Sequence, residues 1–177
     1  MSLLKESDLK SYVIKSSIAL ESASNRALDY ETFDIFLSHS YLDKDLVYAL
    51  KNYLEEKKLT VYVDWIDDRQ LERDSVDAKT AETLRKRMKQ CQSLLFATSS
   101  NSTTSKWMPW ECGYFDGING KIAILPISKN DESSFEGQEY LGLYPYIDVV
   151  GSTIWVNSVT SGFCQLEDWL NGKSPEN

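Results

Sequence analysis

Short apolar runs alternate with segments of helical periodicity along most of this chain, and this alternation limits the fold more than any other feature. The apolar runs are Phe33–Leu37, Thr60–Val63, Ser93–Ala97 and Lys121–Pro126, with either Ile147–Val150 or Thr153–Val156 as a fifth. Their length and their β-branched and aromatic residues predict strands. Because several runs are apolar at nearly every position, we expect both faces of the resulting sheet to be covered.

The segments between the strands predict helices. One begins after Asp43, a residue type that favours N-cap positions, and another carries its basic residues, Arg87 among them, toward water. Trp107–Gly117 predicts a short helix, and Ser161–Asn171 predicts a final one with Phe163 turned inward. Strands that alternate with helices predict an α/β fold with three layers, a central five-stranded parallel sheet and helices on both faces.

Parallel sheets of this kind bind ligands outside the carboxyl ends of their strands. The loops that follow the strands are Ser38–Leu42, Asp64–Asp77, Thr98–Lys106 and Ser128–Tyr144. The chain contains no GxGxxG, GxxxxGK[ST] or GxSxG motif, which argues against a dinucleotide fold, a P-loop and a hydrolase elbow. A phospho-accepting receiver domain is also disfavoured, because the first strand does not end in a carboxylate pair for Mg²⁺.

Composition narrows the classes of partner. The 177 residues fit one domain, and 27 acidic residues against 19 basic ones argue against nucleic acid or an anionic membrane as the main partner. With one histidine and three widely spaced cysteines, we expect neither a metal site nor a disulfide framework. No segment has the pattern of a signal peptide or a transmembrane span, so a soluble, cytoplasmic protein is expected.

Trp107-Met108-Pro109-Trp110-Glu111 is the most unusual stretch of the chain. In a helix, Trp107 and Glu111 lie on one face, and Pro109 falls in the first turn, where its missing N–H costs nothing. Spacing alone slightly favours buried Trp side chains and a surface carboxylate over a ligand site. Aromatic rings beside a carboxylate nevertheless suit a planar, cationic ligand.

Ser38-His39-Ser40 invites a second interpretation, a nucleophile beside its base. Adjacent strand residues point to opposite faces, so such neighbours rarely meet productively. A polar turn at the strand end is favoured, and a role in lining a pocket stays open.

Taken together, these segments resemble the TIR (Toll/interleukin-1 receptor) domain family. Residues 33–40 are similar to its first conserved box, and residues 61–77 to its second strand and BB loop. Residues 105–111 are similar to its third conserved region, in which enzymatic members carry a Trp four residues before a catalytic Glu. The chain departs from the family at residues 70–74, which lack the Gly or Pro usual near the tip of that loop.

The resemblance covers nearly everything after the first thirty residues. It implies a flavodoxin-like TIR domain over residues 31–172. An N-terminal helical extension over residues 1–30 and a flexible tail over residues 173–177 lie outside the family core.

For activity, the resemblance implies cleavage of NAD⁺ at the nicotinamide–ribose bond, with NAD⁺ as substrate and no further cofactor or metal. Glu111 takes the catalytic position, where it binds the ribose and stabilises an oxocarbenium-like transition state, and Trp107 shapes the pocket. Substrate contacts are implied for the strand-end residues Ser38, His39 and Ser40.

Trp65 and Asp67 lie in the BB-like loop, and the same resemblance suggests that they close over the substrate. For these two residues, a place on an ordinary surface loop is about as well supported.

The product depends on the nucleophile. Attack by water gives ADP-ribose, and attack by a group of the same molecule gives a cyclic isomer. A stand-alone chain resembles the TIR components of bacterial anti-phage systems such as Thoeris, which implies immune signalling through a separate downstream effector and self-association through the TIR domain. Two alternatives stay open, a non-enzymatic scaffold that acts by TIR–TIR interaction and a nucleoside-processing enzyme, such as a deoxyribosyltransferase, on a similar sheet.

Overall fold

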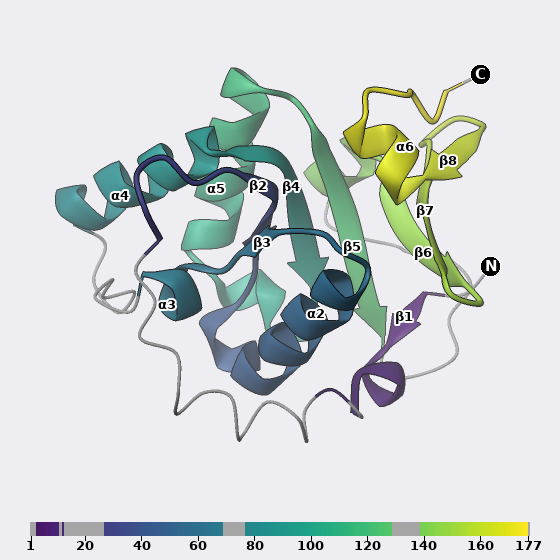
Figure 1. Cartoon of the computed structure of the whole chain (residues 1–177), viewed down its shortest axis with the longest axis horizontal. Helices are drawn as coiled ribbons and strands as arrows, with labels where there is room; N and C mark the ends of the chain where they lie inside the picture. Colours follow the sequence, from purple (N-terminus) through teal and green to yellow (C-terminus); the bar gives the residue numbers. More distant parts are fainter. Residues whose placement is uncertain (1–2, 11, 13–26, 69–76, 129–138, 177) are drawn as a thin grey trace.

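A computed structural model of the chain describes residues 3–10, 12, 27–68, 77–128 and 139–176 (Figure 1). Its centre is an eight-stranded sheet with the order β3-β2-β4-β5-β6-β7-β8, and β1 pairs with β5 off this path. The strands are β1 (Leu4–Lys5), β2 (Phe33–Ser38), β3 (Val61–Tyr62), β4 (Cys91–Thr98), β5 (Ile122–Ser128), β6 (Tyr146–Val150), β7 (Thr153–Asn157) and β8 (Phe163–Gln165).

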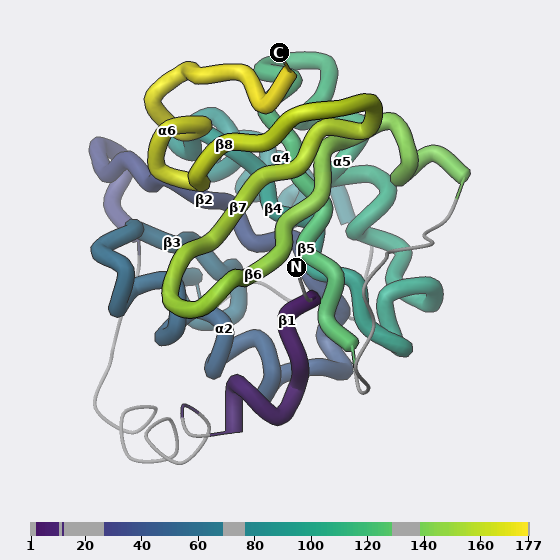
Figure 2. The backbone as a smooth tube through the Cα atoms, turned by 90° about the vertical axis from the view of Figure 1, so that its right-hand side faces the viewer, coloured from purple at the N-terminus to yellow at the C-terminus, as the bar shows by residue number. Residues whose placement is uncertain are grey.

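The predicted five-stranded parallel sheet is confirmed as the part of this larger sheet that runs from its end strand β3 to β6. Strands β3, β2, β4, β5 and β6 pair in parallel, whereas β7 and β8 continue the sheet in antiparallel fashion. Both segments offered for the fifth strand are therefore strands, and Figure 2 shows them, as β6 and β7, side by side with β8. The sheet is larger than predicted because the tight turn after β6 folds the chain back on itself.

Helices cover the two faces of the sheet, as the three-layer prediction requires (Figure 1). They are α2 (Lys44–Glu56), α3 (Asp64–Asp67), α4 (Ala78–Lys89), α5 (Trp107–Ile118) and α6 (Leu166–Leu170). On β4, Leu95 packs with residues of α2 and α6, and its neighbour Leu94 packs with residues of α4 and α5. This alternation follows from the two-residue period of a strand and explains why β4 is apolar at successive positions. We call the two layers of packing the α2-side core and the α5-side core.

Two side chains lie where the sequence did not predict them. Arg87 was expected to face water on α4, but it is buried, with 2% of its surface exposed. Phe163 was expected inside a final helix, but it lies on β8 and is 60% exposed. The final helix is correspondingly shorter, and its Leu166 and Trp169 are buried.

The ends of the chain take part in the domain. Leu4 of β1 pairs with Ile127 of β5, and residues 6–10 are helical, so the segment predicted as a helical extension also supplies a strand. Leu9 is buried in the α2-side core. Residues 13–26 of that segment lie outside the described residues. At the other end, Pro175 is buried.

Within the described part of the chain, no helix has the length and apolar character needed to cross a membrane. Cys91, Cys112 and Cys164 are free and buried.

Asp148 is a buried carboxylate on β6, and among the described residues its Oδ1 has no hydrogen-bond partner. Burial raises the pKa of Asp148, and a hydrogen bond from the Asn157 side chain offsets part of that effect. Because the folded state holds this proton more tightly than the unfolded chain does, Asp148 stabilises the fold below the ordinary Asp pKa of about 3.9. That contribution is lost as the pH rises through the raised pKa.

Asp148→Asn is therefore expected to raise the free energy of unfolding near neutral pH by about 1 kcal/mol relative to wild type. The gain should shrink as the pH falls toward the ordinary Asp pKa, because the wild-type side chain is then protonated too. Urea denaturation across this pH range measures the difference, with Glu82→Gln, an exposed change on α4, as the control. A gain that does not depend on pH would contradict the assignment to ionisation.

Candidate active site

The carboxyl ends of the parallel strands bring Ser38 and Glu111 together. Ser38 is the last residue of β2, and Glu111 lies in the second turn of α5, which follows β4 and its loop. Ser38 Oγ donates a hydrogen bond of 2.6 Å to Glu111 Oε2, across 73 positions of the sequence. Both residues are fully buried. A short hydrogen bond to a carboxylate is a strong one and fixes the side chain on which the proposed chemistry depends.

His39 and Trp65 form a second pair. His39 Nδ1 lies 2.8 Å from the carbonyl oxygen of Leu37, and Trp65 Nε1 donates to His39 Nε2 at 2.9 Å. An indole N–H can only donate, so Nε2 is an acceptor, and the proton sits on Nδ1 in a neutral ring. Asp64 Oδ1 lies 3.7 Å from the same Nε2. His39 is thus held in one tautomer by its neighbours.

The two pairs extend in different directions from β2. Ser38 contacts α5, whereas His39 contacts Trp65, which packs against the α2-side core. The expectation that neighbouring residues diverge at the strand end therefore agrees with the geometry, and Ser38 and His39 do not form a nucleophile–base pair.

The other predicted site residues lie apart from these contacts or support them. Ser40 is buried, and its Oγ accepts a hydrogen bond of 3.4 Å from the N–H of Leu42, as a cap of the short 3₁₀ turn Tyr41–Asp43. Trp107 begins α5 and is buried in the α5-side core. Asp67 does not join either pair, because its carboxylate bonds to Lys51 and to the N–H of Val63 at the outer edge of β3.

The aromatic stretch on α5 is divided between core and surface. Trp107 is buried and meets Trp110 edge to face, with ring centroids 5.4 Å apart. Trp110 is only half-buried and stacks on Tyr114, with Arg85 5.3 Å from its ring centroid. The core interpretation therefore holds for Trp107, but Glu111 is buried rather than a surface charge.

Cys112 follows Glu111 on α5. Burial raises the pKa of the Cys112 thiol to about 11, and a hydrogen bond with Tyr144 offsets part of the rise. The thiol is therefore protonated at neutral pH, adds no negative charge beside Glu111 and is a poor nucleophile.

Sequence reasoning missed a polar clamp beside the site. Asp43 occupies the N-cap position of α2, as predicted, but its side chain does not cap the helix. Its carboxylate accepts hydrogen bonds from Ser99 Oγ and, at 2.6 Å, from Asn101 Nδ2. The clamp joins the turn after β2 to the loop after β4, whereas Ser38 and Glu111 connect the adjoining elements β2 and α5. The only sequence features that pointed to this clamp were the serine-rich loop after β4 and the helix start at Asp43.

Glu111 has no solvent-exposed surface in this structure. A ribose can reach its carboxylate only after neighbouring segments move. The loops predicted to border this edge, Asp64–Asp77 and Ser128–Tyr144, lie partly outside the described residues.

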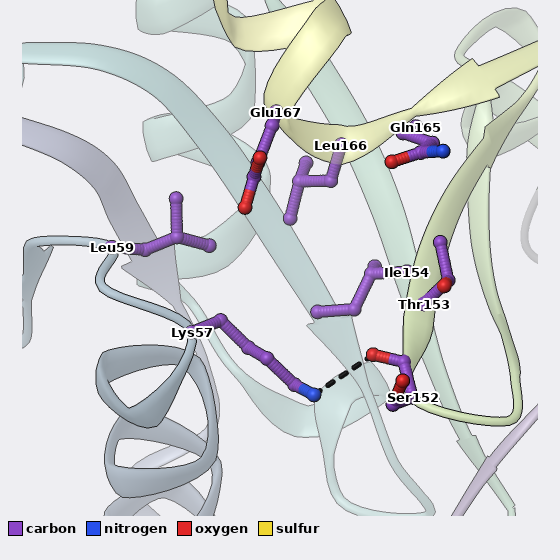
Figure 3. Close-up of a pocket in the computed structure, with 8 residues that line it drawn as sticks. All are labelled: Lys57, Leu59, Ser152, Thr153, Ile154, Gln165, Leu166 and Glu167. Atoms are coloured by element: carbon purple, nitrogen blue, oxygen red, sulfur yellow. Dashed lines mark hydrogen bonds between the residues drawn. The ribbon is translucent and has the colours of Figure 1, made fainter.

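A separate pocket of about 110 Å³ lies elsewhere, between the end of α2, the turn before β7 and the junction of β8 and α6 (Figure 3). Lys57 lines this pocket and donates a hydrogen bond of 2.8 Å to the carbonyl oxygen of Ser152. None of the predicted site residues lines this pocket. Among the described residues, no group of three or more His, Cys, Asp or Glu side chains is arranged to hold a metal ion.

A five-stranded parallel sheet with polar residues at its carboxyl edge and a buried Ser–Glu pair defines the class of protein, an α/β domain with a candidate active site at that edge. Residues 35–163 match the family described as "TIR domain", so the chain belongs to the TIR domain family.

Two curated relatives are similar to this chain. "Probable 3' cyclic ADP-D-ribose synthase ThsB'" of Bacillus cereus (strain MSX-D12) is 46% identical, with 96% of this chain and 98% of the relative covered. "Putative cyclic ADP-D-ribose synthase TIR2" of Cytobacillus dafuensis is 30% identical, over 62% of this chain but only 29% of that protein.

Among solved structures, the crystal structure of the TIR domain of Toll-related Receptor TRR-2 from Hydra magnipapillata is similar, with 15% identity and a TM-score of 0.48. The likeness covers 66% of this chain and 84% of that one. The membership in the family does not depend on it.

Proposed function

We propose that this chain is a TIR enzyme that cleaves NAD⁺ at the nicotinamide–ribose bond and closes the remaining ADP-ribose into a cyclic isomer, of the 3′ kind named for the Bacillus relative. The observation that carries the proposal is the 46% identity to that relative over nearly the whole of both chains. Since 98% of the relative is matched, this chain has a counterpart for nearly every part of the relative that could carry the activity in its name.

The chemistry assigned to Glu111 follows from the charge of the substrate. Nicotinamide leaves a cationic N-glycoside as a neutral molecule, so the step needs no general acid. The bond breaks with positive charge on the ribose, as in glycoside cleavage, and a carboxylate held in place stabilises that charge. The hydrogen bond from Ser38 supports this role because it orients Glu111 before the substrate arrives.

Burial of the site supports cyclisation over hydrolysis. Ser38, His39 and Glu111 are each at most 1% exposed, so a site that closes again around NAD⁺ limits the water that competes for the ribose carbon. An internal nucleophile of the same molecule then takes the place of water. We assign Trp107 to the wall of the nucleotide site around Glu111. Trp65, which donates a hydrogen bond to His39, is assigned to the cover of that site.

Ser40 and Asp67 receive weaker assignments within the same proposal. Ser40 holds the turn that follows Ser38 and His39, which supports an indirect part in shaping the nucleotide site. A direct contact between Asp67 and substrate would require its carboxylate to leave Lys51.

Self-association and a separate effector complete the proposal. Because Glu111 is buried, some event must open the site, and contact between copies of the chain in the cytoplasm is our candidate for it. A diffusible cyclic product would then act on a second protein, as in anti-phage signalling.

Incubation of the purified chain with NAD⁺, followed by mass analysis of the products, tests the function. We expect free nicotinamide together with a product whose mass is that of ADP-ribose less one water. A rate per chain that rises with protein concentration would support self-association. Absence of nicotinamide at every concentration would leave the scaffold alternative as the better one, and turnover of a nucleoside but not of NAD⁺ would favour the third alternative.

A further inference from the structure

Strand β3 forms one end of the sheet, with β2 on its inner side. The carbonyl oxygen of Thr60 faces β2, where it accepts hydrogen bonds from the N–H groups of Asp34 and Ile35 at 3.0 and 3.1 Å. Peptide groups alternate in direction along a strand, so the C=O of Val61 and the N–H of Val63 face the outer edge. Edge groups of this kind are the usual template for pairing with another chain.

Two charged side chains occupy these edge groups. Lys51 Nζ, from α2, donates a hydrogen bond to the carbonyl oxygen of Val61. Asp67 Oδ2, from α3, accepts a hydrogen bond of 2.7 Å from the N–H of Val63. The two side chains also pair with each other, with 3.2 Å between Lys51 Nζ and Asp67 Oδ2, and each is 12% exposed. Together they supply the donor and the acceptor that a neighbouring strand would provide.

A second copy of β3 would satisfy the same two groups. In an antiparallel pair with Tyr62 opposite Tyr62 of the other copy, the N–H of Val63 in each strand points at the C=O of Val61 in the other. A two-fold arrangement makes both hydrogen bonds at once, because such an interface is self-complementary. Lys51 and Asp67 therefore block this pairing directly.

We infer that the outer edge of β3 is a strand-pairing surface for a second copy of this chain, held closed by the Lys51–Asp67 ion pair. Among the described residues, bulk alone does not close it, because a groove of about 520 Å³ runs beside β3 between α2 and α3. Tyr48, Ile66 and Phe33 line that groove together with the ion pair. The ion pair thus opposes edge-to-edge association of two sheets, a role that charged residues commonly have at sheet edges.

The double substitution Lys51→Met/Asp67→Leu tests the inference, because it removes both charges together and leaves no buried charge without a partner. We expect the mass from light scattering to double as concentration rises, while the wild-type chain shows no such dimer through β3. Hydrogen exchange should find the Val63 amide still protected in the dimer, since the partner strand replaces Asp67.

Two further variants make the result specific. Glu55→Gln removes the other carboxylate near Lys51, at 3.1 Å, without touching the edge of β3, and should behave as wild type. Lys51→Gln/Asp67→Asn keeps a donor and an acceptor at these positions and should reduce dimer formation relative to the Met/Leu variant.

A folded Met/Leu variant that stays monomeric up to its solubility limit would overturn the inference, as would a dimer with a freely exchanging Val63 amide. Should that variant not fold, Lys51→Leu/Asp67→Ala, which also removes both charges, is measured instead, and a monomer at every concentration overturns the inference equally. None of these measurements uses NAD⁺, so their failure would leave the proposed function untouched.

Discussion

Glu111→Gln is expected to lower the rate of nicotinamide release from NAD⁺ by about 10²–10³-fold, the usual cost of losing one group that stabilises charge in the transition state. The substitution keeps the size and shape of the side chain. Its amide oxygen can still accept the hydrogen bond from Ser38 Oγ, so the fold should persist while the negative charge disappears. The loss should therefore fall on the rate at saturating NAD⁺ and much less on substrate affinity.

Glu82→Gln is the matched control, because Glu82 is an exposed glutamate on α4, and it should retain wild-type activity. Ser38→Ala leaves the charge of Glu111 but removes its donor, so we expect a smaller loss, on the order of tenfold. Wild-type rates in a folded Glu111→Gln chain would contradict the assigned mechanism. An inactive Glu111→Gln chain without the circular-dichroism spectrum of the folded protein would instead indicate a structural role for the carboxylate.

The part of the site that sequence could predict is the part governed by short-range geometry. Trp107 and Glu111 are related by one helical turn, and α5 begins at Trp107 as predicted. The contact between Ser38 and Glu111 follows less directly. The rule that parallel strands end at one edge places both residues there, but no local pattern specifies the 2.6 Å hydrogen bond between them.

Burial of charge was the property that sequence periodicity predicted least well. Arg87 stands in a basic helix segment, so its pattern indicates exposure. Its partner Asp68 lies 19 positions earlier, after β3, and only the folded chain brings the two together. Asp67 was similarly predicted as part of a substrate loop, although its position at the edge of β3 depends on Lys51 from another helix. Long-range pairs of this kind have no periodic signature.

Arg87→Met is expected to destabilise the fold by about 3–5 kcal/mol, because it leaves the carboxylate of Asp68 buried without its cation. Arg87 Nε and Nη2 donate to the two oxygens of Asp68 at 2.5 and 3.0 Å, and Asp68 has no exposed surface. The guanidinium also donates to the carbonyl oxygens of Ala27 and Leu28, at 2.6 and 3.2 Å. One side chain thus ties α4, the segment after β3 and the residues before β2 together.

Urea denaturation measures the loss, and Lys89→Ala, an exposed change in the last turn of the same helix, is the control for a lost basic residue. Arg87→Met/Asp68→Asn should recover part of the stability, because the unpaired charge is then gone while the asparagine can still bond to the hydroxyl of Tyr62, which donates to Asp68 at 2.9 Å. Equal losses in the single and the double variant would mean that Arg87 acts mainly through its bonds to Ala27 and Leu28. A loss no larger than that of Lys89→Ala would show that the ion pair contributes little to the fold.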